Sequence, residues 1–252
     1  MKATRITFQI LLSAAAVFLA WMCIDSVVTP IRFEETREQR EVKVIKHLMD
    51  IRVAENEYKL VKGYYTADLD SLVLFLRTTP KKEVLKEGAL TDKQLENKMT
   101  EHKAVKILQT AKAKALAKMT FESDSALYAY VWANDKDVKA NDLQGFRRDT
   151  IFKNMIETLY KGEYTEATIG DIIYIPYTDH QRFEIEVNNG YATSQGIHVP
   201  IMAARAHYNT YLHDLDKQEL TNLIDKEQKL DHYPGLMFGS VDAPNNNAGN
   251  WE

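Results

Sequence analysis

The feature that most constrains this chain is an uncharged apolar stretch near its N-terminus. Ile6 to Ile24 spans 19 residues and contains no charged side chain. As a helix rising about 1.5 Å per residue, it is long enough to cross the ~30 Å hydrocarbon core of a bilayer. Lys2 and Arg5 precede it, and Asp25 closes it. Because basic residues favour the cytoplasmic side, residues 1–30 are predicted to be a single-pass inner-membrane anchor, with the C-terminal body in the periplasm.

A cleaved signal peptide is the alternative interpretation of this stretch. The stretch is longer than the usual apolar core of a signal peptide, and no small-x-small cleavage pattern follows it. Met22, directly before the single cysteine Cys23, is too bulky for a lipoprotein cleavage site. We therefore favour an uncleaved anchor. One cysteine also excludes an internal disulfide framework and a thiol-rich zinc site.

A long charged helix is predicted directly after the anchor. Residues 32–61 contain neither glycine nor proline, and apolar residues recur at helical spacing. This stripe comprises Ile45, Leu48, Ile51, Ala54, Tyr58 and Val61. Glu34 to Glu41 is charged all round, which is typical of a solvated stalk or of a surface that packs on neighbouring copies. We expect one long helix, interrupted near Pro30 and capped at Gly63.

The remainder of residues 31–120 is predicted to be mostly helical. Leu69 to Leu76 is a short apolar run that favours a helix. Thr91-Asp92-Lys93-Gln94 fits a capping box and predicts a second helix reaching about Met119. We expect that helix to be solvated on one side.

Residues 121–252 are predicted to form an α+β head with a small antiparallel sheet. Asn188 to Gly190 is expected to be a turn, and Pro200 indicates an edge strand. Strands are expected at residues 127–132, 172–177, 182–187, 197–203 and 236–241, and helices at 147–159 and 216–230. The fold class is therefore α+β: an N-terminal transmembrane helix that continues into a long helix, followed by the head.

Composition and motifs exclude several function classes. The net charge is −4, and the chain after residue 31 has 30 basic and 35 acidic residues, so no basic nucleic-acid-binding face is expected. The seven histidines do not form a His-Glu-x-x-His motif, and phosphate-binding and dinucleotide-binding motifs are absent from the sequence. We assign no catalytic residue, no metal ligand and no cofactor. Asp242 and Asn245 to Asn247 offer calcium-type oxygen atoms, but a turn that bonds its own backbone is the favoured interpretation.

Several short motifs follow the anchor in a fixed order. They are Asp50-Ile51-Arg52-x-Ala54, Tyr58-Lys59, Gly63-x-Tyr65 and Leu69-x-x-Leu72. Residues 6–76 in this order resemble the N-terminal part of type II secretion pseudopilins and type IV pilins. No glycine precedes the apolar stretch where pilins are cleaved, and Gln9 is the polar residue nearest to the place of the pilin glutamate. The tail, Tyr233 to Glu252, resembles that of a family of uncharacterised bacterial envelope proteins.

The resemblance implies a non-enzymatic structural subunit of a pseudopilin-like secretion or envelope assembly. Its partners would be the inner membrane, other subunits of the complex and further copies of itself. Ser13 to Ala16 together with Ala20 gives the anchor a face of small residues that suits helix association. The alternative is a membrane-tethered module that binds a peptide, a glycan or a partner protein through Tyr174, Tyr177, Phe183 and Pro200. An enzyme would instead require a deep pocket with convergent polar groups.

Overall fold

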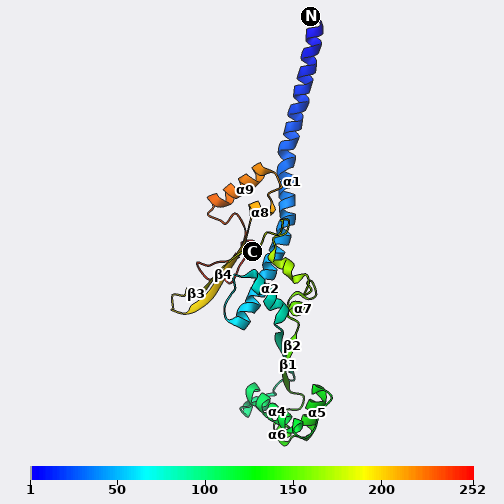
Figure 1. Cartoon of the computed structure of the whole chain (residues 1–252), viewed down its shortest axis with the longest axis vertical. Coiled ribbons are helices and arrows are strands. Elements are labelled where there is room, and N and C mark those ends of the chain that lie inside the picture. The colour runs from blue at the N-terminus through cyan, green and yellow to red at the C-terminus, as the bar shows by residue number, and fades with distance from the viewer. Residues whose placement is uncertain (1) are drawn as a thin grey trace. The chain divides into compact units, whose positions relative to one another are not determined.

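The computed structural model describes residues 2–252, and describes side chains from residue 11 onward. The chain is α+β and forms two compact units (Figure 1). Unit 1 combines the chain up to Thr79 with Met155–Glu252, and unit 2 is Pro80–Asn154. The sequence had suggested a boundary near residue 120, which falls inside unit 2. The difference arises because the two ends of unit 2 pair with each other as strands, which makes it an insertion into unit 1.

Helix α1 runs without interruption from Lys2 to Lys62. The expected break at Pro30 is wrong, because Pro30 lies inside the helix and both flanks remain helical. Proline removes one backbone hydrogen bond from the helix interior, but the many hydrogen bonds of the long helical segments on either side are retained. The N-terminal part of α1 is long and apolar enough to cross a membrane, and its most apolar window is not buried within the protein. The side chains of Lys2, Arg5 and Gln9 lie outside the described part.

The C-terminal half of α1 is the central element of the unit 1 core. The predicted stripe is confirmed at Leu48, Ile51, Ala54 and Tyr58, which are all buried, whereas Val61 is exposed. These residues pack against α2, α7, the 3₁₀ helix η1 and two strands of the sheet. The bounds are α2 Leu69–Thr78, α7 Met155–Tyr160 and η1 Ile169–Ile173. This part of α1 therefore belongs to the head and is not a separate stalk.

Unit 1 contains an antiparallel sheet with the strand order β3–β4–β5. Its strands are β3 Glu184–Ala192, β4 His198–His207 and β5 Gly235–Gly239, which confirms the three strands predicted near these positions. Pro200 lies in the central strand, so the edge assignment is wrong. The strand tolerates it because β5 pairs with β4 only from Ala203 onward, and because the β3 register shifts between Asn188 and Tyr191. That shift also means that the predicted turn at Asn188 to Gly190 is a bulge within β3.

The C-terminal tail lies along the open edge of β5. Gly249 forms a bridge with Phe238, and the Asn250 side chain bonds both Met237 N and Gly235 O, at 3.1 and 2.8 Å. Trp251 packs against the core. The tail therefore covers a sheet edge that would otherwise expose unpaired backbone groups.

Two further helices complete unit 1. They are α8 Tyr208–Tyr211 and α9 Lys217–Lys229. The predicted start of α9 is confirmed, since Asp216 accepts hydrogen bonds from the N–H groups of Gln218 and Glu219. The predicted strand at residues 172–177 is wrong, because this segment is the end of η1 followed by a single bridge at Tyr174.

Unit 2 has its own small core on a two-stranded ribbon. The ribbon pairs β1 with β2 from Lys81↔Lys153 to Glu87↔Arg147. Its elements are β1 Lys81–Glu87, α3 Asp92–Glu96, α4 Glu101–Leu116, α5 Asp124–Asn134, α6 Lys136–Ala140 and β2 Arg147–Lys153. The helices bury Leu108, Leu127, Val131 and Leu143 together.

Three sequence predictions in or beside unit 2 are wrong. The aromatic run at residues 127–132 is helix α5 and not a strand, because Leu127 and Val131 are buried at helical spacing and Ser123 caps the helix. The expected helix at 147–159 is β2 followed by α7. The expected helix at 91–119 is divided into α3 and α4 at Lys98, whose φ of 56° ends the first helix.

Candidate functional site

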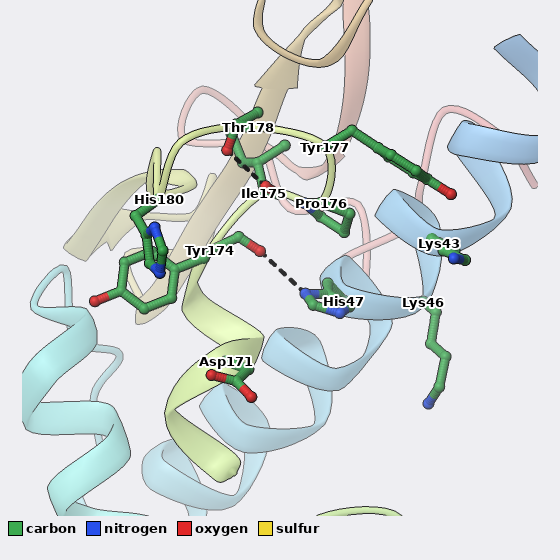
Figure 2. Close-up of a pocket in the computed structure, with 10 residues that line it drawn as sticks. All are labelled: Lys43, Lys46, His47, Asp171, Tyr174, Ile175, Pro176, Tyr177, Thr178 and His180. Carbon is green, nitrogen blue, oxygen red and sulfur yellow. Dashed lines mark hydrogen bonds between the residues drawn. The ribbon is translucent and has the colours of Figure 1, made fainter.

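A cleft in unit 1 lies between α1 and the segment 171–180. We call it the α1 cleft; it has a volume of about 450 Å³. Lys43, Lys46 and His47 line it from α1, and Figure 2 shows the opposite wall. That wall is formed by Asp171, Tyr174, Ile175, Pro176, Tyr177, Thr178 and His180. The cleft thus joins an aromatic and apolar wall to a basic helix face.

A tight loop positions the aromatic wall. Its ends are joined by a 2.7 Å hydrogen bond from Ile175 N to Gln181 O, and the Thr178 hydroxyl donates to Ile175 O at 2.7 Å. Tyr177 has a φ of 64° and His180 a φ of 56°. A residue with a Cβ atom in this left-handed region costs about 1–2 kcal/mol, so the surrounding bonds must hold the loop in place. Such outliers occur preferentially at functional sites.

Two cations of α1 face the ring of Tyr177. The guanidinium carbon of Arg40 lies 5.0 Å from the ring centroid, and the ammonium of Lys43 lies 5.3 Å from it. Arg40 is neutralised by Asp214, with contacts of 2.5 and 2.7 Å, and this hydrogen bonding lowers the pKa of Asp214 to about 2. Within the described residues, no carboxylate forms an ion pair with Lys43. Lys43 therefore supplies an uncompensated positive charge at the rim of the cleft.

His47 forms part of the floor of the cleft. Its Nδ1 atom lies 3.0 Å from the carbonyl oxygen of Tyr174, drawn as a dashed line in Figure 2. Burial lowers the pKa of His47, so the imidazole is neutral at neutral pH. Because the carbonyl can only accept, Nδ1 carries the proton and Nε2 presents a lone pair.

Lys46 differs from Lys43 because its charge is already balanced. Its ammonium lies 2.5 Å from Glu163 Oε2 and 3.3 Å from Asp50 Oδ2. The Tyr164 hydroxyl also donates to Asp50, at 2.6 Å. The cleft therefore has the available ammonium of Lys43, the neutral imidazole of His47, the imidazole of His180 and the exposed carboxylate of Asp171. The Thr178 hydroxyl is engaged with the backbone, so these groups are suited to binding a charged ligand rather than to nucleophilic attack.

A second cleft of about 380 Å³ lies where the Asn-rich loop meets α1. The Asn247 side chain donates to Tyr65 Oη at 2.9 Å and to Asn56 Oδ1 at 3.2 Å. The Lys59 ammonium lies 3.3 Å from Tyr65 Oη. The turn prediction is confirmed, because Asn245 Oδ1 accepts from Asn247 N at 3.1 Å.

These contacts do not suit calcium. Calcium requires six to eight oxygen ligands, whereas here the amides bond the protein and an ammonium lies among them. No group of three His, Cys, Asp or Glu side chains that could hold a metal ion occurs in the part of the chain that the structure describes. The hydrogen bonds of Asn247 instead hold the C-terminal tail against α1, and an ion pair of 2.6 Å between Arg52 on α1 and Glu252 strengthens this contact.

The residues predicted for a binding surface are distributed among different places. Tyr174 and Tyr177 both line the α1 cleft, Pro200 lines the cleft of the Asn-rich loop, and Phe183 is buried in the core. Lys43 and His47 were not predictable as site residues from the sequence, because the opposite wall lies more than 120 residues away along the chain. The one local signal was their position beside the buried stripe of α1.

Comparison with models of protein families, with curated proteins and with solved structures finds no match to this chain.

Proposed function

We propose that this chain is a non-enzymatic, single-pass inner-membrane protein that serves as a structural subunit of a pilin-like secretion or envelope assembly. Its head would lie in the periplasm. The observation that carries the proposal is the continuity of α1, since one helix contains both the apolar span and the central part of the head core.

A continuous helix couples the head to the anchor without a flexible linker. With 61 residues, α1 is about 90 Å long at about 1.5 Å per residue. The head of each copy would then have a defined orientation relative to its own anchor. A tethered enzyme gains little from such coupling, whereas a subunit that packs laterally requires it.

The residues that carry the pilin resemblance also support the proposal. Tyr58, Tyr65, Leu69 and Leu72 are all buried, and they form one packed junction between α1 and α2. The Asn189 side chain accepts from Tyr65 N and donates to Tyr65 O, both at 2.9 Å, which fixes the turn between the two helices. The motifs that resemble those of pilins thus form a packed junction where the long helix α1 ends and α2 begins.

A face of small residues on the anchor suits lateral packing. Of the small residues predicted for this face, Ala16 and Ala20 lie on one side of α1 together with Cys23. Ala14 lies on the opposite side and is not part of the face, because consecutive residues of a helix are about 100° apart. Small residues let two helix backbones approach closely in a membrane, where van der Waals packing drives association.

Copurification of two differently tagged copies from one membrane in mild detergent tests the proposal. We expect the wild type to copurify with the second tag, and Ala16→Leu and Ala20→Leu to reduce this recovery severalfold. Ala14→Leu is the matched control, because it adds the same volume on the other face, and it should leave recovery unchanged. If all three variants were recovered like the wild type, or if the wild-type copies did not copurify, the proposed assembly through this face would be refuted.

A further inference from the structure

We propose that the α1 cleft is a binding site for a carboxylate group attached to an apolar body. The carboxylate would accept a hydrogen bond from the Lys43 ammonium and a second one from His47 once Nε2 takes up a proton from solvent, and the apolar part would pack on Tyr174, Pro176 and Tyr177. This inference does not depend on the proposed assembly function.

The charge balance of the cleft favours an anion with a single charge. Arg40 and Lys46 have carboxylate partners at 2.5 Å, whereas among the described side chains Lys43 faces the ring of Tyr177, at 5.3 Å, and no carboxylate. A charge-assisted hydrogen bond from Lys43 to a ligand carboxylate would complete the pattern. A phosphate carries up to two charges, so Asp171, the one acidic side chain among the described residues that line the cleft, would repel it more strongly than a carboxylate.

The shape of the cleft favours an apolar body on the ligand. Ile175 is buried, while Tyr174 and Pro176 are partly exposed and form a surface beside the polar groups. Sites for small ligands typically combine such a wall with a few convergent polar groups in a cleft of about 300–1,000 Å³. The left-handed backbone of Tyr177 holds its ring at the rim, beside Lys43.

His47 provides a reporter within the site. The charged groups around it are Lys46 and Asp50 on α1 and Asp171 on η1. Burial, which lowers the pKa of His47, is the largest effect; Lys46 also lowers this pKa, whereas Asp50 and Asp171 raise it. A bound carboxylate would stabilise the imidazolium, so ligand binding should raise the pH at which the ring titrates. An opposite charge within about 4–6 Å moves such a midpoint by about one unit or more.

The experiment is a titration of full-length protein in detergent micelles, followed through the NMR signals of the His47 ring. The probes are phenylacetate, a short peptide with one glutamate beside a phenylalanine, and inorganic phosphate. For a single charge-assisted contact with apolar packing we expect dissociation constants in the millimolar range for the carboxylate probes, which correspond to a binding free energy of about −4 kcal/mol. Preference for phenylacetate would indicate a small carboxylic acid as the natural ligand, and preference for the peptide would indicate an acidic protein segment.

Variants distinguish the site from a general charge effect. Lys43→Gln should weaken carboxylate binding about tenfold, so that the His47 shift requires about ten times more probe than in the wild type. Tyr177→Gly should also weaken binding without lowering the melting temperature, because glycine adopts a φ of 64° without strain. Lys62→Gln removes the same charge from an exposed position on α1 outside the cleft and should bind like the wild type. An unshifted His47 ring with both carboxylates, an equal shift in Lys43→Gln at the same amount of probe, or equally tight binding of phosphate would each overturn the proposal.

Discussion

Glu55 is a carboxyl group fully buried in the head. It lies on α1 beside Ala54, with no exposed surface, and its Oε2 atom accepts one hydrogen bond from Thr66 N at 3.1 Å. Oε1 has no hydrogen-bond partner within the described residues. Burial raises the pKa of Glu55 to about 8, which the bond from Thr66 only partly offsets. We predict that Glu55→Gln stabilises the protein at alkaline pH.

The magnitude follows from the two pKa values. In the unfolded chain Glu55 titrates near 4.5, and in the folded protein near 8. A raised acid pKa means that stability is fully present below the unfolded value and is lost as the pH rises through the folded value. Each pH unit in this window costs about 1.4 kcal/mol, so the wild type should lose about 3–4 kcal/mol between about pH 5 and pH 8 through this one group. Glutamine keeps the acceptor for Thr66 and has no charge to bury.

The assay is thermal unfolding of full-length protein in detergent, followed by circular dichroism at several pH values. The melting temperature of Glu55→Gln should exceed that of the wild type by an amount that widens by roughly 10 °C from about pH 5 to pH 8. Glu38→Gln removes a carboxylate from an exposed position on the same helix and should run parallel to the wild type. If the Glu55→Gln and wild-type curves were parallel across this range, Glu55 would be ionised in the folded protein and the reasoning would be refuted.

Two further predictions concern the separate cores of the two units. The Asp149 carboxylate accepts from the Tyr128 hydroxyl at 2.6 Å, so Asp149→Ala should destabilise unit 2 by about 2 kcal/mol and leave the amide NMR signals of unit 1 unchanged; uniform changes in both units would contradict their independence. Gly239→Ala would place a Cβ atom 2.1 Å from Met202 O at a φ of 76°, and should prevent the sheet of unit 1 from forming. Gly196→Ala is the control, because Gly196 has the same φ but an added Cβ atom would have no neighbour within 4 Å. If Gly196→Ala lowered the melting temperature as much as Gly239→Ala, backbone strain and not the contact with Met202 would be responsible.

The elements that depend on local signals were predictable from the sequence. The apolar stripe of α1, the cap at Gly63 and the start of α9 at Asp216 depend on spacing or on a single cap. The two caps are confirmed, and the stripe is confirmed up to Tyr58 but not at Val61, which is exposed. The alternation of residues 182–187 identified β3 for the same reason. Local periodicity carries this information because each of these elements has one buried face.

The elements that depend on distant partners were not predictable. The paired residues of β1 and β2 are 60 to 72 residues apart in the chain, so the sequence could not show that residues 80–154 are an insertion. The run from Leu127 to Trp132 has strand propensity, but Ser123 caps it as a helix and the helix buries Leu127 and Val131 in the core of unit 2. The α1 cleft combines Lys43 with Tyr177, which are brought together only by the packing of η1 against α1.

The most direct test of the central claim is oxidative cross-linking in native membranes through Cys23, the single cysteine of the chain. Cys23 lies seven residues after Ala16, on the same face of α1. Assembly of parallel copies through this face would bring two Cys23 thiols together. The account predicts a disulfide-linked dimer that is abolished in Cys23→Ser, reduced in Ala16→Leu and unchanged in Ala14→Leu. A chain that stays monomeric under oxidation, or a dimer that forms equally in Ala16→Leu, would contradict lateral assembly through the anchor.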